Sequence, residues 1–172
     1  MLSHYQLSAI SFRLFRSATD LECMRSILDD NTRDELLRRL GRLTPDTRPI
    51  WGKMTPSQMM EHAARVFDMA TGRKPMKQVF VGKALSWIFK KEFLGEKPFK
   101  PNRPTGPDFK IQDQPEFEST RVRLIELINE FHNLGESGLD GNVHGFFGPL
   151  TGKQWGETQY KHLDHHLRQF GV

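Results

Sequence analysis

Four segments of this 172-residue chain repeat apolar side chains at the period of an α-helix. They cover residues 31–43, 55–71, 115–134 and 151–170, and no segment shows the apolar–polar alternation of a half-buried strand. Residues 95–115 carry five of the ten prolines, which disfavour both a helix and a central strand. The pattern therefore predicts an all-α protein, a four-helix bundle with one long irregular crossover.

Two of the predicted helices begin with the same signal, a threonine followed three residues later by a glutamine. Thr55 and Gln58 open one helix, and Thr151 and Gln154 open the other. The side chains of such a pair can exchange hydrogen bonds with the backbone at the start of a helix. Pro56 at the first helical position supports the earlier of the two starts. These signals predict where both helices begin.

A further segment, residues 79–94, is apolar around most of its helical circumference. It lies within residues 73–103, which hold nine lysines or arginines against Glu92 and Glu96, a net charge of +7. The whole chain has a net charge of +4, which leaves −3 for the other residues. Such a helix usually lies across a bundle or packs in a homodimer. A helix that binds a membrane surface or phosphate is the alternative.

Residues 1–23 differ from the rest of the chain. They contain no acidic residue before Asp20, four serines and two arginines, and they have no clear period. An organellar transit peptide has this composition. Our preferred interpretation is a disordered or non-native extension, with Met24 as the natural start. We therefore divide the chain into an extension, residues 1–23, and a helical domain, residues 24–172.

Cysteine usage and charge exclude several classes of protein. The single cysteine, Cys23, cannot support a disulfide framework or a structural zinc site with two or more thiolates. No stretch approaches the about 20 uninterrupted apolar residues of a membrane span. A net charge of +4 is too small to indicate a nucleic-acid partner. We expect a cytoplasmic protein that does not span a membrane. A nucleic-acid partner, bound through residues 73–103, is a less favoured alternative.

Three of the seven histidines lie in the last predicted helix. At about 100° per residue, His162 and His166 lie on one flank of its apolar stripe, and Trp155 lies on the same flank two turns earlier. His165 lies on the far side, and we expect it to face water. In the second helix, His62 is the one polar member of the apolar stripe.

This distribution suggests a metal site. Histidines at positions i and i+4 lie one helical turn apart and can bind one ion together. A catalytic site needs a third ligand and an open position, and His62 could supply the ligand from a facing helix. The spacing alone leaves alternatives, because His162 and His166 could decorate the surface and His62 could be a satisfied core residue. His144 lies in a glycine-rich stretch, where a histidine is more often part of a turn than a ligand.

Several motifs occur together along the chain: WGKMTPSQM at 51–59 followed by Glu61-His62, FFG at 146–148, and YKHLDHHLRQF at 160–170. Over about residues 24–172 the chain resembles the DinB/YfiT-like superfamily, and within it an uncharacterised branch that ends in a KHLDHHLRQFG-type helix. The resemblance implies a four-helix bundle with a divalent metal held by one histidine of the second helix and an HxxxH pair of the last. The matching positions are His62, His162 and His166. His144-Gly145 departs from the His-Pro expected in this branch, which affects the expected loop conformation only.

Three neutral imidazoles leave the full charge on a divalent ion, which strongly acidifies a bound water or thiol. Such a site suits hydrolysis or the transfer of a small thiol. The superfamily includes low-molecular-weight-thiol S-transferases and a thiol-dependent isomerase. By resemblance we expect a metal-dependent S-transferase or hydrolase that acts on a small-molecule substrate. Zinc is the expected metal, with nickel, manganese and iron as alternatives, and a low-molecular-weight thiol is the expected cofactor of a transferase. A non-enzymatic metal-binding or stress-associated bundle protein is the alternative.

Three further side chains are candidates for the pocket around the ion. Gln58 lies one turn before His62, whereas Trp155 and Gln159 lie on the flank of the last helix that carries the histidine pair. Each has a structural alternative, because Gln58 could only close a capping box, Trp155 could fill the core and Gln159 could face solvent. The sequence identifies no catalytic residue, since Asp164 points away from the pair.

Overall fold

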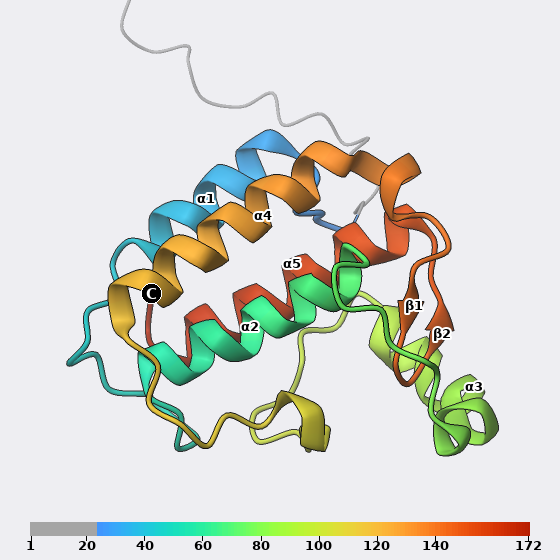
Figure 1. The fold of residues 1–172 in the computed structure, drawn as a ribbon, viewed down its shortest axis with the longest axis horizontal. Coiled ribbons are helices and arrows are strands. Elements are labelled where there is room, and N and C mark those ends of the chain that lie inside the picture. Colours follow the sequence, from blue (N-terminus) through green and yellow to red (C-terminus); the bar gives the residue numbers. More distant parts are fainter. Residues whose placement is uncertain (1–23) are drawn as a thin grey trace, which may run out of the picture.

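The computed structural model describes residues 24–172, so the expectations for residues 1–23 and Cys23 lie outside the described part of the chain. The described residues form five α-helices, one short 3-10 helix and one small hairpin (Figure 1). In chain order these elements are α1 (Asp30–Leu40), α2 (Pro56–Ala70), α3 (Phe80–Leu94), η1 (Pro107–Phe109), α4 (Phe117–Leu139), β1 (Val143–His144), β2 (Gly148–Pro149) and α5 (Gly152–Gln169). The predicted all-α class is confirmed.

The core lies between α1, α2, α4 and α5, in which α4 and α5 each contact the other three helices. Phe67 of α2 meets Phe131 of α4 edge to face, with ring centroids 5.3 Å apart. Leu36 of α1 and Leu163 and Leu167 of α5 are fully buried. Leu36, Phe131, Leu163 and Leu167 are positions of the apolar stripes that the helical period predicts, whereas Phe67 was not among the predicted positions.

Both predicted helix starts are present. The Thr55 side chain accepts a hydrogen bond from the backbone N–H of Gln58, and the Gln58 side chain accepts one from the N–H of Thr55. Thr151 and Gln154 form the same reciprocal pair at the start of α5. Because these boxes fix the first residues of α2 and α5, they also fix which side chains each helix turns inward.

Two details of the prediction need correction. The helix expected to end at residue 134 is interrupted at Gly135, where φ is +61°, but the chain continues helically to Leu139. No strand was predicted, whereas Val143 pairs with Pro149 and His144 with Gly148 in an antiparallel hairpin. Strands of two residues are too short to show an alternating pattern in the sequence.

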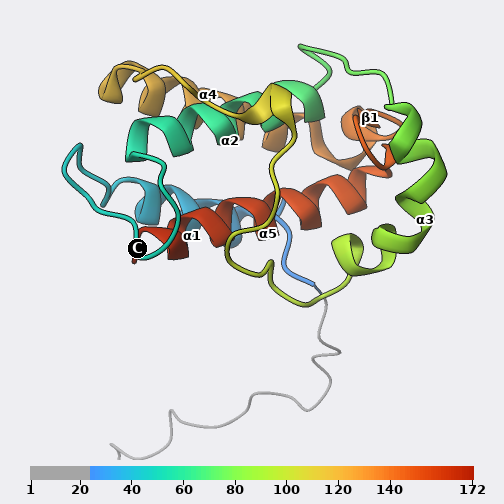
Figure 2. The same cartoon turned by 90° about the horizontal axis from the view of Figure 1, so that it is seen from below.

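Helix α5 is the central element of the fold. It contacts α1, α2, α3 and α4, while the irregular connection from α3 to α4 passes beside it (Figures 1 and 2). Helix α3 lies at the edge of the molecule, against α5 and β2 (Figure 2). Among the described residues, no helix is both long and apolar enough to span a membrane.

Candidate metal centre

His62 comes to the site on the buried face of α2. The capping box at Thr55 sets the start of the helix, and His62 follows two turns later beside Met59 and Ala63. Its side chain is 6% exposed. A polar ring at this depth requires partners for its nitrogens, because an unpaired buried polar group is costly.

His162 and His166 reach the same place from α5, one turn apart. His166 is buried, and His162 is partly buried. The Nε2 atom of His162 lies 3.0 Å from Nε2 of His62 and 3.2 Å from Nε2 of His166. One ring nitrogen from each histidine lies within 4.8 Å of the others, and this group could hold a metal ion.

Two of the three rings are oriented by hydrogen bonds on their other nitrogen. His62 Nδ1 lies 2.9 Å from the carbonyl oxygen of Phe109 in η1, and His166 Nδ1 lies 2.9 Å from Oε1 of Gln169. The Gln169 amide orientation is fixed in turn, because its Nε2 donates to the carbonyl of Trp51 at 2.8 Å. Both Nδ1 atoms therefore face acceptors and carry the proton.

This assignment leaves the lone pairs of His62 Nε2 and His166 Nε2 directed at His162. The Nε2 atom of His162 can donate a proton to only one of them, so a second lone pair is left facing nitrogen. A shared cation resolves this conflict. Two nitrogens bound tetrahedrally to one ion at ~2.0–2.1 Å lie about 3.3–3.4 Å apart, close to the two separations of 3.0 and 3.2 Å that His162 Nε2 makes with the other rings. The donor set and its spacing therefore fit a divalent metal.

Burial keeps the three rings neutral. It lowers the pKa of His62, lowers that of His166 to about 3 and holds that of His162 well below its usual range. In each case the main cause is desolvation, which penalises the imidazolium form. Neutral imidazole is the form that ligates metals.

The other predicted pocket residues have different surroundings. Gln58 completes the capping box, and its Nε2 donates to the carbonyl of Asp113 at 3.1 Å. Trp155 is buried, and its indole N–H donates to the carbonyl of Asn142. Gln159 is 1% exposed, and within residues 24–172 its Oε1 has no hydrogen-bond partner. It lies on the same face of α5 as His162 and His166, so it presents an unused acceptor beside that pair.

The expectation that His165 faces water is wrong. His165 is 9% exposed, its ring packs against Trp51, and its Nδ1 lies 3.2 Å from the carbonyl of Phe99. A helical wheel shows one apolar face, but α5 is covered on its other side as well, by the segment that contains Phe99. That covering comes from residues about 66 positions away in the sequence.

His144 also has a more defined place than a turn residue. Its ring packs against Phe93, Phe147 and Trp155, with centroids 5.2, 4.9 and 5.7 Å away. Its Nδ1 accepts hydrogen bonds from the backbone N–H groups of Phe146 and Phe147. Burial lowers its pKa to about 4. It stabilises the tip of the hairpin as a neutral ring, which agrees with the predicted role in a turn.

Three contributors to the site were not predicted: the Gln169 side chain and the carbonyls of Trp51 and Phe109. Gln169 follows His166 by three residues, a spacing that places two side chains together on a helix, so a signal for it was present. The roles of the two backbone carbonyls could not be predicted from the sequence, because every residue has a backbone carbonyl.

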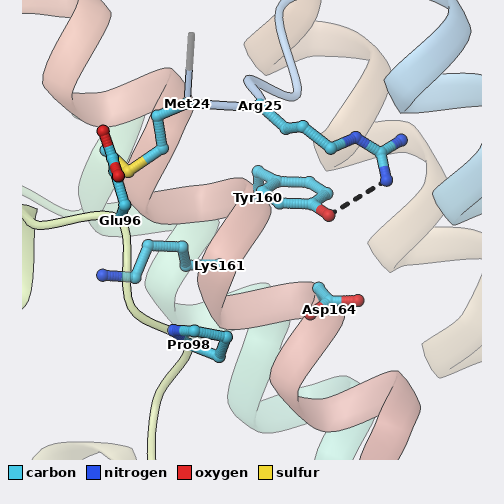
Figure 3. A pocket seen from close by; sticks show the side chains of 7 residues that line it. All are labelled: Met24, Arg25, Glu96, Pro98, Tyr160, Lys161 and Asp164. Carbon is cyan, nitrogen blue, oxygen red and sulfur yellow. Dashed lines mark hydrogen bonds between the residues drawn. The ribbon is translucent and has the colours of Figure 1, made fainter. Parts of the chain in front are cut away.

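A cavity of about 350 Å³ lies elsewhere on α5 (Figure 3). The α5 residues that line this cavity, Tyr160, Lys161 and Asp164, lie about 100–160° around the helix axis from His162. The cavity therefore does not open beside the histidines. Arg25 donates a hydrogen bond to the Tyr160 hydroxyl at 3.0 Å along this cavity. The residues that line it are Met24, Arg25, Glu96, Pro98, Tyr160, Lys161 and Asp164.

Comparison with known proteins agrees with the geometry of the fold. Searches of curated proteins and of solved structures find no match to the chain. The model of the DinB superfamily matches residues 28–170, which includes all the helices described above and all three converging histidines. The chain therefore belongs to the DinB superfamily.

Proposed function

We propose that this protein is a divalent-metal-dependent enzyme whose ion is held by His62, His162 and His166. The observation that carries the proposal is the set of opposed Nε2 atoms, 3.0 and 3.2 Å apart, with the Nδ1 atoms of two rings committed to other acceptors. Membership of the DinB superfamily supports it. Zinc is the first candidate, because three imidazoles with one open position form a common catalytic zinc site.

A divalent ion bound by three neutral ligands retains its charge and lowers the pKa of a water or thiol that occupies its open position. The protein contributes the orientation of its ligands. The carbonyl of Phe109 holds the ring of His62, and Gln169 holds that of His166. Such partners also raise the basicity of a ligand and fix its tautomer.

Gln159 is our candidate for a residue that contacts substrate. Among residues 24–172 its buried Oε1 has no hydrogen-bond partner, and it lies one turn before His162 on the same face of α5. An unpaired carbonyl oxygen at this depth would accept a hydrogen bond from an N–H or O–H group of a bound small molecule. Asp164 is not a candidate base, because its carboxylate pairs with Arg39 and Arg168 on another side of the helix.

The reaction that we propose is the transfer of a small thiol to an electrophilic substrate, with hydrolysis of a small molecule as the second candidate. Both reactions need only an acidified nucleophile at the open position and a substrate held beside it. The thiol reaction is favoured by the resemblance to thiol-dependent members of the superfamily.

Metal content measured by mass spectrometry tests the site directly. His62→Ala, His162→Ala and His166→Ala should each lose most of the bound metal, whereas His132→Ala, which removes a histidine of α4 that contacts Arg33, should retain it. Circular dichroism should show that all four variants remain helical. Retention of metal by all three site variants would exclude this site.

A panel of small thiols and electrophiles, assayed with the metal-loaded protein, tests the reaction. Activity that is lost in the His166→Ala variant would support a transferase, and activity on esters or amides without added thiol would support a hydrolase. Metal binding with neither activity would favour the non-enzymatic alternative.

A further inference from the structure

The outer face of α3 is apolar, and no other part of residues 24–172 covers it. Phe80 is 85% exposed, Trp87 is 76% exposed and Ile88 is 49% exposed. These residues lie within about 100° of one another around the helix, so they share one face. Large aromatic side chains are rarely left this exposed unless they contact a ligand, a partner or a membrane.

The opposite face of α3 holds the helix in place. Gly82 lies so close to the hairpin that an added Cβ would be 2.3 Å from the carbonyl oxygen of Phe146. The ring of Phe93 stacks on that of Phe147, with centroids 4.1 Å apart. Because this inner face is packed, Phe80 and Trp87 cannot turn inward without breaking it. Figure 2 shows α3 at the edge of the molecule, with its far side free of the other described elements.

The surroundings of α3 are strongly basic. Residues 73–103 carry a net charge of +7, whereas the rest of the chain carries −3 out of a total of +4. Lys91 lies at an angle around the helix between those of Phe80 and Ile88, and Lys97 is exposed just beyond the end of the helix. Glu92, one of the two acids in this segment, pairs with Arg103. The exposed apolar face is therefore surrounded by positive charge.

We propose that the outer face of α3 binds an anionic lipid surface. Aromatic and aliphatic side chains enter the interface between headgroups and acyl chains, while neighbouring lysines attract the negative headgroups. The helix lies in the plane of the interface, in agreement with the absence of a spanning helix among the described residues. This inference does not depend on the proposed metal-dependent function.

Charge and area both favour this occupant over a second copy of the chain. A symmetric pair of α3 helices would bring two segments of net charge +7 together, and like charges at an interface disfavour association. Phe80, Trp87 and Ile88 expose on the order of 400 Å² between them, about half of the ~800 Å² that a standard protein interface buries on each partner. Insertion into a lipid interface needs only a few such side chains.

Co-sedimentation of the full chain with vesicles tests the proposal. We expect binding to phosphatidylcholine vesicles that contain phosphatidylglycerol, at least about tenfold weaker binding to pure phosphatidylcholine, and loss of binding as salt rises. Trp87→Ser should remove most of the binding. Its matched control is Val122→Ser, which changes an exposed apolar residue of α4. Lys91→Glu with Lys97→Glu should weaken binding on the order of tenfold, and Lys53→Glu should not.

The same variants identify the results that would overturn the proposal. Equal binding of the wild-type chain and Trp87→Ser to anionic vesicles would place the contact outside α3, and absence of binding to either vesicle would exclude a lipid partner. Sedimentation velocity supplies the third test. A dimer that Trp87→Ser converts to a monomer would assign the face to a second copy instead.

Discussion

The side chain of Gln169 should determine how tightly the proposed three-histidine site binds a metal ion. Its Oε1 accepts a hydrogen bond from His166 Nδ1 at 2.9 Å, and its Nε2 donates one to the Trp51 carbonyl at 2.8 Å. Gln169 therefore connects His166, a proposed metal ligand, to the loop before α2. Gln169→Leu keeps a similar volume but removes both hydrogen bonds. Loss of a group that orients a ligand typically lowers metal affinity by about 10–100-fold, and we expect a decrease in that range.

The same change should destabilise the protein. Gln169 is 4% exposed, so the N–H of His166 and the carbonyl of Trp51 would both lose a buried partner. Each unsatisfied group costs about 1–3 kcal/mol. Two such groups together cost about 2–6 kcal/mol, which corresponds to a decrease in melting temperature of roughly 4–24 °C for a chain of this size.

Competition with a chromogenic chelator measures the metal affinity, and thermal unfolding of the metal-free protein measures the stability. The matched control is Gln154→Leu, which removes a glutamine at the other end of α5. It breaks a capping box and should cost about 1 kcal/mol without changing metal affinity. Equal metal affinity of Gln169→Leu and the wild type would refute the role given to this hydrogen bond.

Two further predictions follow from the surroundings of the site. Gly52 has φ = +81°, and a Cβ added there would lie 2.5 Å from Nε2 of Gln169. Gly52→Ala should therefore lower both the melting temperature and the metal affinity. The control Lys53→Ala should change neither. The pKa of His144 is about 4 in the folded chain because the ring is buried, below its value of about 6.5 when unfolded. The unfolded state therefore binds more protons in this window, and stability should fall by up to about 3 kcal/mol as pH decreases from about 6.5 to 4. His144→Phe should reduce this slope in denaturant titrations at several pH values, and an unchanged slope would show that His144 does not contribute.

The helices and most of the core could be predicted because they depend on local order. The period of apolar residues places Leu36, Phe131 and Leu163 inward, and the reciprocal hydrogen bonds of the Thr-x-x-Gln pairs involve residues only three apart. The hairpin of Val143 and Gly148 could not be predicted, because two-residue strands leave no period. The helical continuation past Gly135 was missed because a glycine with positive φ usually ends a helix.

The sequence by itself determined which histidines could meet. The spacing of His162 and His166 places them on one side of a helix whatever the rest of the chain does, and His62 stands in an otherwise apolar stripe. Only the tertiary structure decided what surrounds them. The carbonyls of Phe109 and Trp51 and the cover over His165 come from loops far away in the sequence. A backbone carbonyl is common to all residues and a loop has no period, so these partners are specified by the packing of the whole chain around α5.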